Sequence, residues 1–182
     1  MKPHDNRNSI ENYLPDGQLS LPGYHSIVSV ITNYKILKSI SLNCPLESLL
    51  IPASQLMTVP QFTAGWTTPL INIIGMMIQS GFNAIPILDD CNRVVNVYAS
   101  PDILQYVTDT LDFDLTIPVE SAIINRSPNF EGVHTCKESD TLGYVISGFK
   151  KSTVHRILVV DELKKLLGII RLVDIMKYLV LE

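Results

Sequence analysis

The sequence predicts an α/β protein made of two copies of one unit, each a short, mostly antiparallel sheet packed against two helices. Three observations lead to this fold class. The chain contains an internal repeat, each copy reads helix–strand–strand–helix, and 46% apolar against 18% charged residues in 182 is typical of a folded chain. At this length there is room for one ordinary domain or two small ones.

The repeat aligns residues 67–107 with residues 139–179 at a constant offset of 72 residues, without a gap. Identities are few, but the apolar or polar character agrees at most other positions. An internal repeat of this kind indicates a repeated structural unit. The matching pairs include Leu70 and Leu142, Ile74 and Ile146, Ile85 and Ile157, Asp89 and Asp161, Asp102 and Asp174, Ile103 and Ile175, and Tyr106 and Tyr178.

The first copy begins with a predicted helix. Thr68 is placed to cap it, and Pro69 suits the first helical position, where no N–H is needed. Gly81 is expected to end this helix. The residues expected on its buried face are Leu70, Ile73, Ile74 and Met77.

Two strands and a second helix complete the first copy. We expect a buried strand at residues 84–90, a turn at 91–93 and an antiparallel partner at 94–98. Ser100 is expected to cap a helix that has Pro101 at its first position and runs to about residue 109.

The second copy repeats this order. Asp140 takes the capping role ahead of a helix that runs to residue 151. Strands are expected at residues 156–161 and 166–170, followed by a closing helix. Two further segments, residues 55–62 and 130–136, are each expected to add an edge strand.

An upstream segment resembles only the last part of a copy. Residues 26–40 match a final strand and helix, with Lys35 at the aspartate position. Half a unit cannot bury its own apolar face and therefore needs a neighbour. The expected organisation is a disordered lead at 1–25, a unit remnant at 26–43, a unit at 55–110, a linker at 111–129 and a unit at 130–181.

Composition argues against several classes of protein. A net charge of −4 and a pI near 5.5 give no reason to expect nucleic acid or an anionic membrane as partner. Cys44, Cys91 and Cys136 are widely spaced and odd in number, which predicts neither a disulfide framework nor a zinc site. Because no signal peptide or membrane-spanning run is recognisable, a cytoplasmic and nuclear location is expected.

A unit of this length and order, used in tandem, resembles the cystathionine-beta-synthase (CBS) domain, two of which form a Bateman module. The local sequences resemble, more specifically, the second half of the gamma regulatory subunit of the AMP-activated and sucrose-nonfermenting protein kinases. That family carries four CBS units, so a truncated gene model, a fragment and a degenerate paralogue all stay open. The sequences concerned are "TTPLINII", "NRSPNFEGVHTC", "VHRILVVD" and "VITNYKILKSISLNC".

Two aspartates are the first candidates for a binding role. Asp102 and Asp174 stand at the start of the last helix of each copy. A carboxylate there accepts hydrogen bonds from both hydroxyls of a diol, and the helix N-terminus stabilises its charge. A simple helix-start acid is the alternative explanation. The resemblance implies contact with the ribose of an adenine nucleotide.

Basic and small residues complete the predicted site. His155 and Arg156 precede a buried strand, and an arginine fork suits phosphate oxygens. A surface pair that covers a strand end is the alternative. The resemblance further implies phosphate contact by Arg126 and nucleotide contact by Thr68. It implies the same for Asn83 and Ala84, which lie at the mouth of the first strand of the first copy.

The chain also departs from the family at several positions. Ala99 and Arg171 stand where a serine or threonine is usual three residues before the aspartate. Arg171 could either grip phosphate or block the pocket. Val173, Asn83 and Tyr34 also differ from the customary residues. These departures predict weaker nucleotide affinity, or binding at a single site.

The sequence carries no recognisable catalytic or metal-binding motif, so we expect a regulatory subunit and no enzyme. The expected ligands are AMP, ADP or ATP, with no cofactor or metal. The expected partners are the kinase catalytic alpha subunit and the beta scaffold subunit. Two units are half of a four-unit assembly and should expose an apolar surface, which predicts pairing with another module or a homodimer. The alternative is a CBS interaction scaffold that binds no nucleotide.

Overall fold

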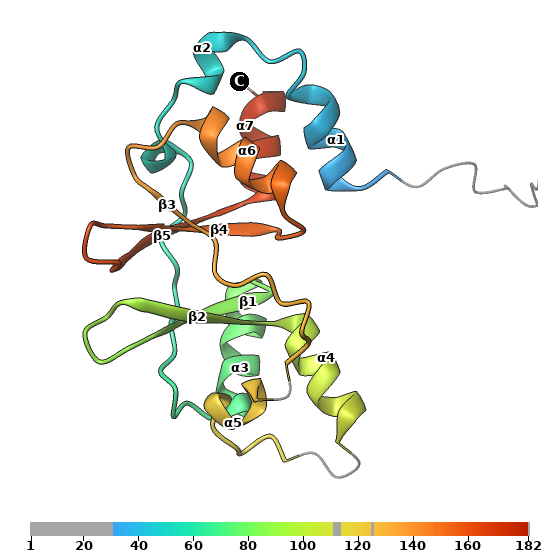
Figure 1. Ribbon diagram of the computed structural model, residues 1–182, viewed down its shortest axis with the longest axis vertical. Coiled ribbons are helices and arrows are strands. Elements are labelled where there is room, and N and C mark those ends of the chain that lie inside the picture. Colours follow the sequence, from blue (N-terminus) through green and yellow to red (C-terminus); the bar gives the residue numbers. More distant parts are fainter. Residues whose placement is uncertain (1–30, 111–113, 125, 182) are drawn as a thin grey trace, which may run out of the picture.

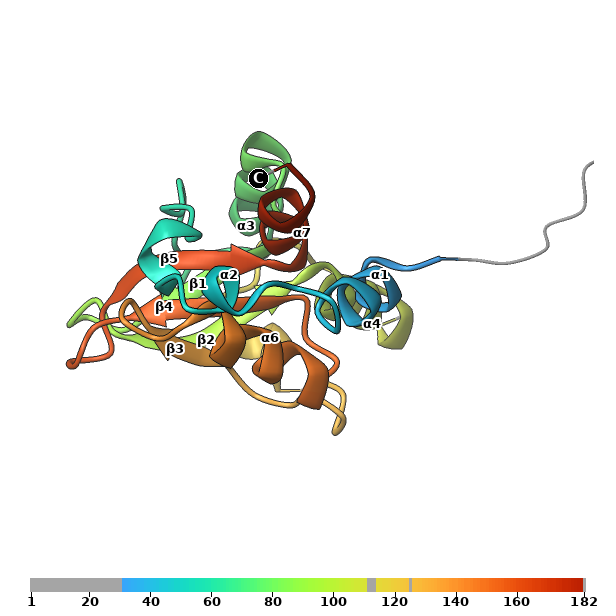
Figure 2. The same cartoon turned by 90° about the horizontal axis from the view of Figure 1, so that it is seen from above.

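The computed structural model describes residues 31–110, 114–124 and 126–181. Its elements form two units stacked along the long axis of the molecule (Figure 1). The two sheets lie toward the middle, while the helices lie at the two ends. Seen from above, α3 and α7 lie on one side of the strands and α6 lies on the other (Figure 2). The predicted repeat of two α/β units is therefore confirmed.

The first unit contains one two-stranded sheet. Strand β1 (Ala84–Leu88) pairs antiparallel with β2 (Val94–Ala99), so that Ala84 lies opposite Ala99. The helices of this unit are α3 (Leu70–Ser80), α4 (Ser100–Asp109) and the short α5 (Val119–Ile123).

The second unit repeats this hairpin and adds a strand. β4 (Arg156–Val160) pairs antiparallel with β5 (Leu166–Arg171), and Arg156 lies opposite Arg171. β3 (Thr135–Lys137) pairs parallel with β4 at the other edge. The helices are α6 (Leu142–Lys151) and α7 (Leu172–Leu181). Three elements precede both units, namely α1 (Asn33–Ile40), α2 (Leu46–Leu49) and the 3-10 turn η1 (Ala53–Gln55).

The helix boundaries confirm one predicted signal and correct three. The first correction concerns Ser100, which is the first residue of α4 and not its cap, a position that Ala99 takes. Gly81 ends α3 with φ of 68°, a left-handed conformation that suits glycine. Thr68 does not cap α3, because the cap position belongs to Pro69 and the Thr68 hydroxyl accepts from the N–H of Gly65 instead. In the second unit the cap is Thr141, whose side chain accepts from the N–H of Tyr144, and not Asp140.

The two predicted edge strands have different outcomes. The segment 130–136 ends in β3, as expected. The segment 55–62 forms no strand, and Thr58 makes only an isolated bridge to Ile169 of β5. The chain leaves β5 after this bridge because it crosses to the other unit, where Ala64 pairs with Ile87.

Each unit has its own core. The first packs α3 and α5 on the hairpin, with Leu70, Ile73 and Tyr98 fully buried. The second packs α6 and α7 on its sheet around Phe149 and Ile170. A small apolar cluster of three β1 and β2 residues, together with Val133, lies apart from both cores; its strand members are Ala84, Val97 and Ala99.

The helix of the predicted half-unit packs against the second unit. Helix α1 lies against α7, and Leu37 of α1 is 1% exposed within the second core. The strand expected ahead of α1 and the lead at 1–25 lie outside the described residues. The domain boundaries drawn from the sequence stay predictions. None of the helices in the described ranges is long and apolar enough to cross a bilayer.

Candidate functional site

Two pockets lie where the units meet, and the repeat relates them. The first, here the Asp102 pocket, is lined by Ala99, Pro101 and Asp102 at the start of α4 and by residues 153–156 at the entrance to β4. The second, the Arg171 pocket, is lined by residues 171–173 at the start of α7 and by residues 81–83 ahead of β1. Each pocket therefore combines the helix start of one unit with the strand entrance of the other.

The two pockets differ in their remaining wall and in size. Residues 129–134 cover the Asp102 pocket, which has a volume of about 190 Å³. Residues 32–34 border the Arg171 pocket, which has a volume of about 610 Å³. Ligand pockets are typically about 300 to 1,000 Å³. The Arg171 pocket thus has room for a mononucleotide, whereas the volume of the Asp102 pocket falls below the usual range.

The two predicted aspartates occupy the same position in both units. Asp102 Oδ2 accepts a hydrogen bond from the N–H of Ala99 at 2.8 Å, and Asp174 Oδ2 accepts from the N–H of Arg171 at 2.9 Å. Each carboxylate thus reaches back over the first turn of its own helix. At the start of α4 the side chain that accepts a backbone hydrogen bond is therefore Asp102 and not Ser100, whose hydroxyl donates to the carbonyl of Asn83.

Asp174 also holds the side chain of Arg171. Nε and Nη2 of Arg171 donate to the two carboxylate oxygens at 2.9 and 2.7 Å. The pair raises the pKa of Arg171, chiefly through the hydrogen bond to Asp174. The guanidinium stacks over the ring of Phe82 at 4.4 Å. Arg171 lines the Arg171 pocket, whereas Asp174 does not.

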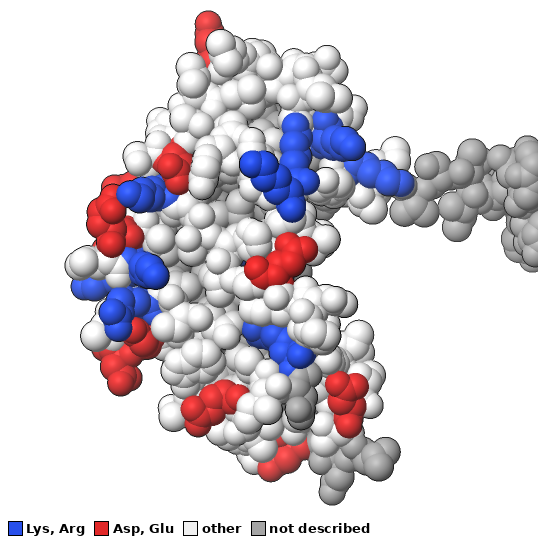
Figure 3. Space-filling model, in the orientation of Figure 1, with Lys and Arg blue, Asp and Glu red and all other residues white. Residues whose placement is uncertain are grey.

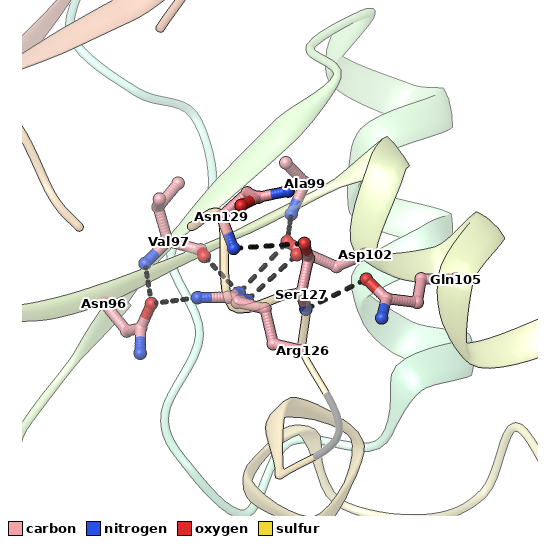
Figure 4. A network of polar contacts seen from close by, with 8 residues as sticks. All are labelled: Asn96, Val97, Ala99, Asp102, Gln105, Arg126, Ser127 and Asn129. Carbon is pink, nitrogen blue, oxygen red and sulfur yellow. Dashed lines mark hydrogen bonds and ion pairs between the residues drawn. The ribbon is translucent and has the colours of Figure 1, made fainter. Parts of the chain in front are cut away.

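Asp102 is held by an arginine from a different place in the chain. Arg126 belongs to the segment between the units, and its Nε lies 2.9 Å from Oδ1 of Asp102 (Figure 4). Its Nη2 donates to Oδ2 at 3.0 Å. The structure therefore brings two predicted site residues together, but it pairs them with each other. The predicted contact of Arg126 with phosphate stays a prediction.

His155 and Arg156 lie at the junction of the two units. His155 is exposed and lines both pockets, whereas Arg156 lines the Asp102 pocket. Nη2 of Arg156 donates to Oδ1 of Asn83 at 3.1 Å. Burial lowers the pKa of Arg156, and the charge of Asp102 acts in the opposite direction. Arg156 thus faces the space between the strand entrances, as the sequence predicts.

Two other predicted residues lie outside the pocket walls. Ala84 is 3% exposed and belongs to the small apolar cluster. Thr68 lies at the turn before α3 and lines neither the Asp102 nor the Arg171 pocket. The roles that the family resemblance implies for them stay predictions.

Sequence reasoning missed the wall of the Asp102 pocket formed by residues 129–134. Phe130 lies over the Arg126 guanidinium at 4.0 Å, and Glu131 accepts hydrogen bonds from the N–H and hydroxyl of Thr153. These bonds lower the pKa of Glu131. The aromatic and acidic residues of "NFEGVH" were available as a signal, but the partner of Glu131 lies 22 residues away.

Positive charge gathers beside the junction. Figure 3 shows Lys and Arg side chains over α1 and the end of α6. The exposed lysines of these helices are Lys35, Lys38, Lys150 and Lys151, and neither helix carries an acidic residue. Such a surface favours anionic ligands.

The described residues contain no group of His, Cys, Asp or Glu side chains that could hold a metal ion. Their three cysteines are free thiols. What the junction offers is a pair of helix-start carboxylates, an arginine between two strand entrances and a basic surface beside them.

Comparisons with known proteins agree with this architecture. A family model of the CBS domain matches residues 125–181. The 5'-AMP-activated protein kinase subunit gamma of Saccharomyces cerevisiae is 38% identical over 159 residues, which cover 85% of this chain and 49% of that protein. The subunit from Kluyveromyces lactis is 37% identical over 163 residues, covering 84% and 48%. The chain therefore spans about half the length of these curated relatives.

Solved structures show the same fold. Protein MJ1225 from Methanocaldococcus jannaschii superposes with a TM-score of 0.69 at 21% identity, covering 84% of this chain and 55% of that one. The CBS domain protein PAE2072 from Pyrobaculum aerophilum, which was solved with AMP, superposes with a TM-score of 0.58 at 18% identity and covers 68% and 89%. At these identities the likeness concerns the fold alone, and it confirms the predicted tandem CBS pair.

Proposed function

Because the chain belongs to the gamma-subunit family of the 5'-AMP-activated protein kinases, which it matches over 85% of its length, we propose that it regulates such a kinase by binding adenine nucleotides. Binding would occur at the junction of its two CBS units. AMP, ADP and ATP are ligands in this proposal, and the chain itself carries out no chemistry. A nucleotide would shift the chain between states by as much as its affinities for those states differ.

One observation carries the proposal. In both units an aspartate holds the helix start that faces, across a pocket, the strand entrance of the other unit, and His155 and Arg156 lie at one of these strand entrances. A diol, a dianionic phosphate and a flat base need an acceptor, a cation and an apolar wall, respectively. All three kinds of group surround the junction.

Isothermal titration of AMP into the protein tests the proposal. The unmodified chain should release binding heat, and Asp174→Ala should weaken binding at least tenfold while circular dichroism stays unchanged. Thermal-shift measurements with AMP, ADP, ATP and NAD identify the preferred ligand, since a ligand of the native state raises the melting temperature. Equal heats from both proteins would contradict the assignment of Asp174.

A second candidate function has one specific observation in its favour. Both carboxylates already hold an arginine, Asp102 with Arg126 and Asp174 with Arg171. A CBS pair with both acids occupied could act as an interaction scaffold without nucleotide. Failure of every adenine nucleotide to raise the melting temperature at millimolar concentration would favour this alternative.

The proposed partners are the catalytic alpha and beta scaffold subunits of the kinase. The exposed apolar side chains Ile71 and Ile78 of α3 and Val180 of α7 support pairing with another module, or with a second copy. Co-purification of tagged chain with both subunits tests the first, and light scattering across a concentration series tests the second. Fluorescence microscopy of a tagged chain would test the proposed cytoplasmic and nuclear location.

A further inference from the structure

The two carboxylates of the repeat are both paired with arginine, but the pairs differ in origin. Arg171 is three residues from Asp174 on the same chain segment, whereas Arg126 comes from the segment between the units. We infer that Arg126 is an internal ligand of Asp102. Its guanidinium takes the place of a sugar diol and closes that site, so the chain binds one nucleotide, in the Arg171 pocket. The inference rests on the proposed function.

Other groups besides Asp102 also bind the guanidinium of Arg126. Its Nη2 also donates to the carbonyl of Val97 at 2.7 Å, and its Nη1 donates to Oδ1 of Asn96 at 2.8 Å (Figure 4). Together with the two contacts to Asp102, the guanidinium has partners on three residues of the first unit. A diol that displaced it would leave a buried cation without these partners, which is unfavourable.

Packing and backbone contacts fix the arginine further. The Arg126 side chain is 6% exposed and that of Asp102 14% exposed, and the ring of Phe130 lies 4.0 Å from the guanidinium. The next residue is tied down as well, since the N–H of Ser127 donates to Oε1 of Gln105 in α4 at 2.9 Å. The segment that carries Arg126 is therefore anchored to the helix that carries Asp102.

The arginine of the other pair is held less firmly. Within the described residues, the guanidinium of Arg171 makes hydrogen bonds to Asp174 alone and stacks on the ring of Phe82, and the side chain is 29% exposed. A rotation about its side-chain bonds would free the Asp174 carboxylate without leaving the guanidinium buried and unpaired. It would also carry the cation into the larger pocket, where it could meet phosphate.

Titration calorimetry with AMP on matched variants tests the inference. We expect one site in the unmodified chain. Asp174→Asn should weaken AMP at least tenfold, and Asp102→Asn should change its affinity less than twofold. Two sites in the unmodified chain, or equal losses from the two substitutions, would overturn the inference while leaving the proposed function standing.

Removal of the arginine gives the converse test. Arg126→Met keeps an apolar stem against Phe130 and should create a second AMP site. The double variant Arg126→Met with Asp102→Asn leaves no unpaired buried charge, so it folds even where the single variant is destabilised, and it should return to one site. A double variant that still binds two AMP molecules contradicts the inference. No binding of AMP by any of the proteins, the unmodified chain included, instead defeats the proposed function.

Discussion

The guanidinium of Arg156 donates a hydrogen bond to Oδ1 of Asn83 over 3.1 Å, and this contact joins the strand entrances of the two units. Arg156 lines the Asp102 pocket and Asn83 lines the Arg171 pocket. One cation therefore lies between both pockets. We therefore expect a phosphate bound beside Asn83 in the Arg171 pocket to reach Arg156 as well.

Arg156→Ala should lower the affinity for AMP at least tenfold. A hydrogen bond to a charged group contributes about 1.5–3 kcal/mol, and the variant loses one from phosphate. Calorimetry at low and high salt should also show a smaller salt dependence. Lys165→Ala is the matched control, because it removes the same charge from an exposed residue that lines neither pocket and lies outside the basic surface of α1 and α6. Equal losses in both variants would mean that only net charge matters.

A close contact between Gly168 of β5 and Met57 gives a prediction for stability. A Cβ on Gly168 would lie 2.6 Å from Sδ and 2.8 Å from Cβ of Met57. The backbone beside Met57 cannot move away freely, since Thr58 exchanges two hydrogen bonds with Ile169. Gly168→Ala should lower the free energy of unfolding in urea by about 1–3 kcal/mol.

Two further variants separate this clash from a general effect of alanine. Adding Met57→Ala to Gly168→Ala should recover part of the loss, because the obstructing side chain is gone. Gly75→Ala, in the middle of α3 where nothing lies within 4 Å of the added Cβ, should stabilise by about 0.5–1 kcal/mol. If the double variant is no more stable than Gly168→Ala alone, the contact with Met57 is not the cause.

Local signals in the sequence predicted much of the fold. The repeat placed Asp102 and Asp174 at equivalent helix starts, and Gly81 ended α3 where a left-handed residue is needed. These features depend on neighbours within a few residues. Helix caps were misplaced by one residue at Thr68, Ser100 and Asp140, since sequence patterns fix a helix end only to within a residue or two.

The pairing at the site could not be predicted in the same way. Arg126 meets Asp102 from 24 residues away, and it does so because the segment between the units folds back over α4. The aligned repeat covers residues 67–107 and 139–179, so it says nothing about the segment that carries Arg126. The pocket wall at residues 129–134 was missed for the same reason.

The three thiols should react in a fixed order with a disulfide reagent. Cys91 is exposed, Cys44 is half-buried and Cys136 is 4% exposed. Burial, with a smaller effect of Asp140, raises the pKa of Cys136 to about 12, so its reactive thiolate is scarce at pH 8. Ellman's reagent should label one thiol rapidly, a second slowly and the third only in urea. Cys91→Ser should remove the rapid phase, and rapid labelling of Cys136 in the native protein would contradict its burial.

The hydroxyl of Tyr98 gives a prediction for alkaline pH. Tyr98 is fully buried in the first core, and its hydroxyl has no hydrogen-bond partner in the described part of the chain. An unsatisfied buried hydroxyl costs about 1–3 kcal/mol. Tyr98→Phe keeps the ring and should raise the free energy of unfolding by about that amount at pH 8, measured in urea.

The same variant should change how stability depends on pH. Burial raises the pKa of Tyr98 to about 12, above the ordinary value of 10.0. Between these values the unfolded chain loses the tyrosine proton while the folded chain keeps it, so the free energy of unfolding falls as pH rises, by about 1.4 kcal/mol per pH unit. Tyr98→Phe removes this contribution, whereas that of Cys136 is common to both proteins and cancels in their difference. The gap between the variant and the unmodified chain should therefore widen from pH 9 to pH 11, and a constant gap would show that Tyr98 ionises at its ordinary pKa.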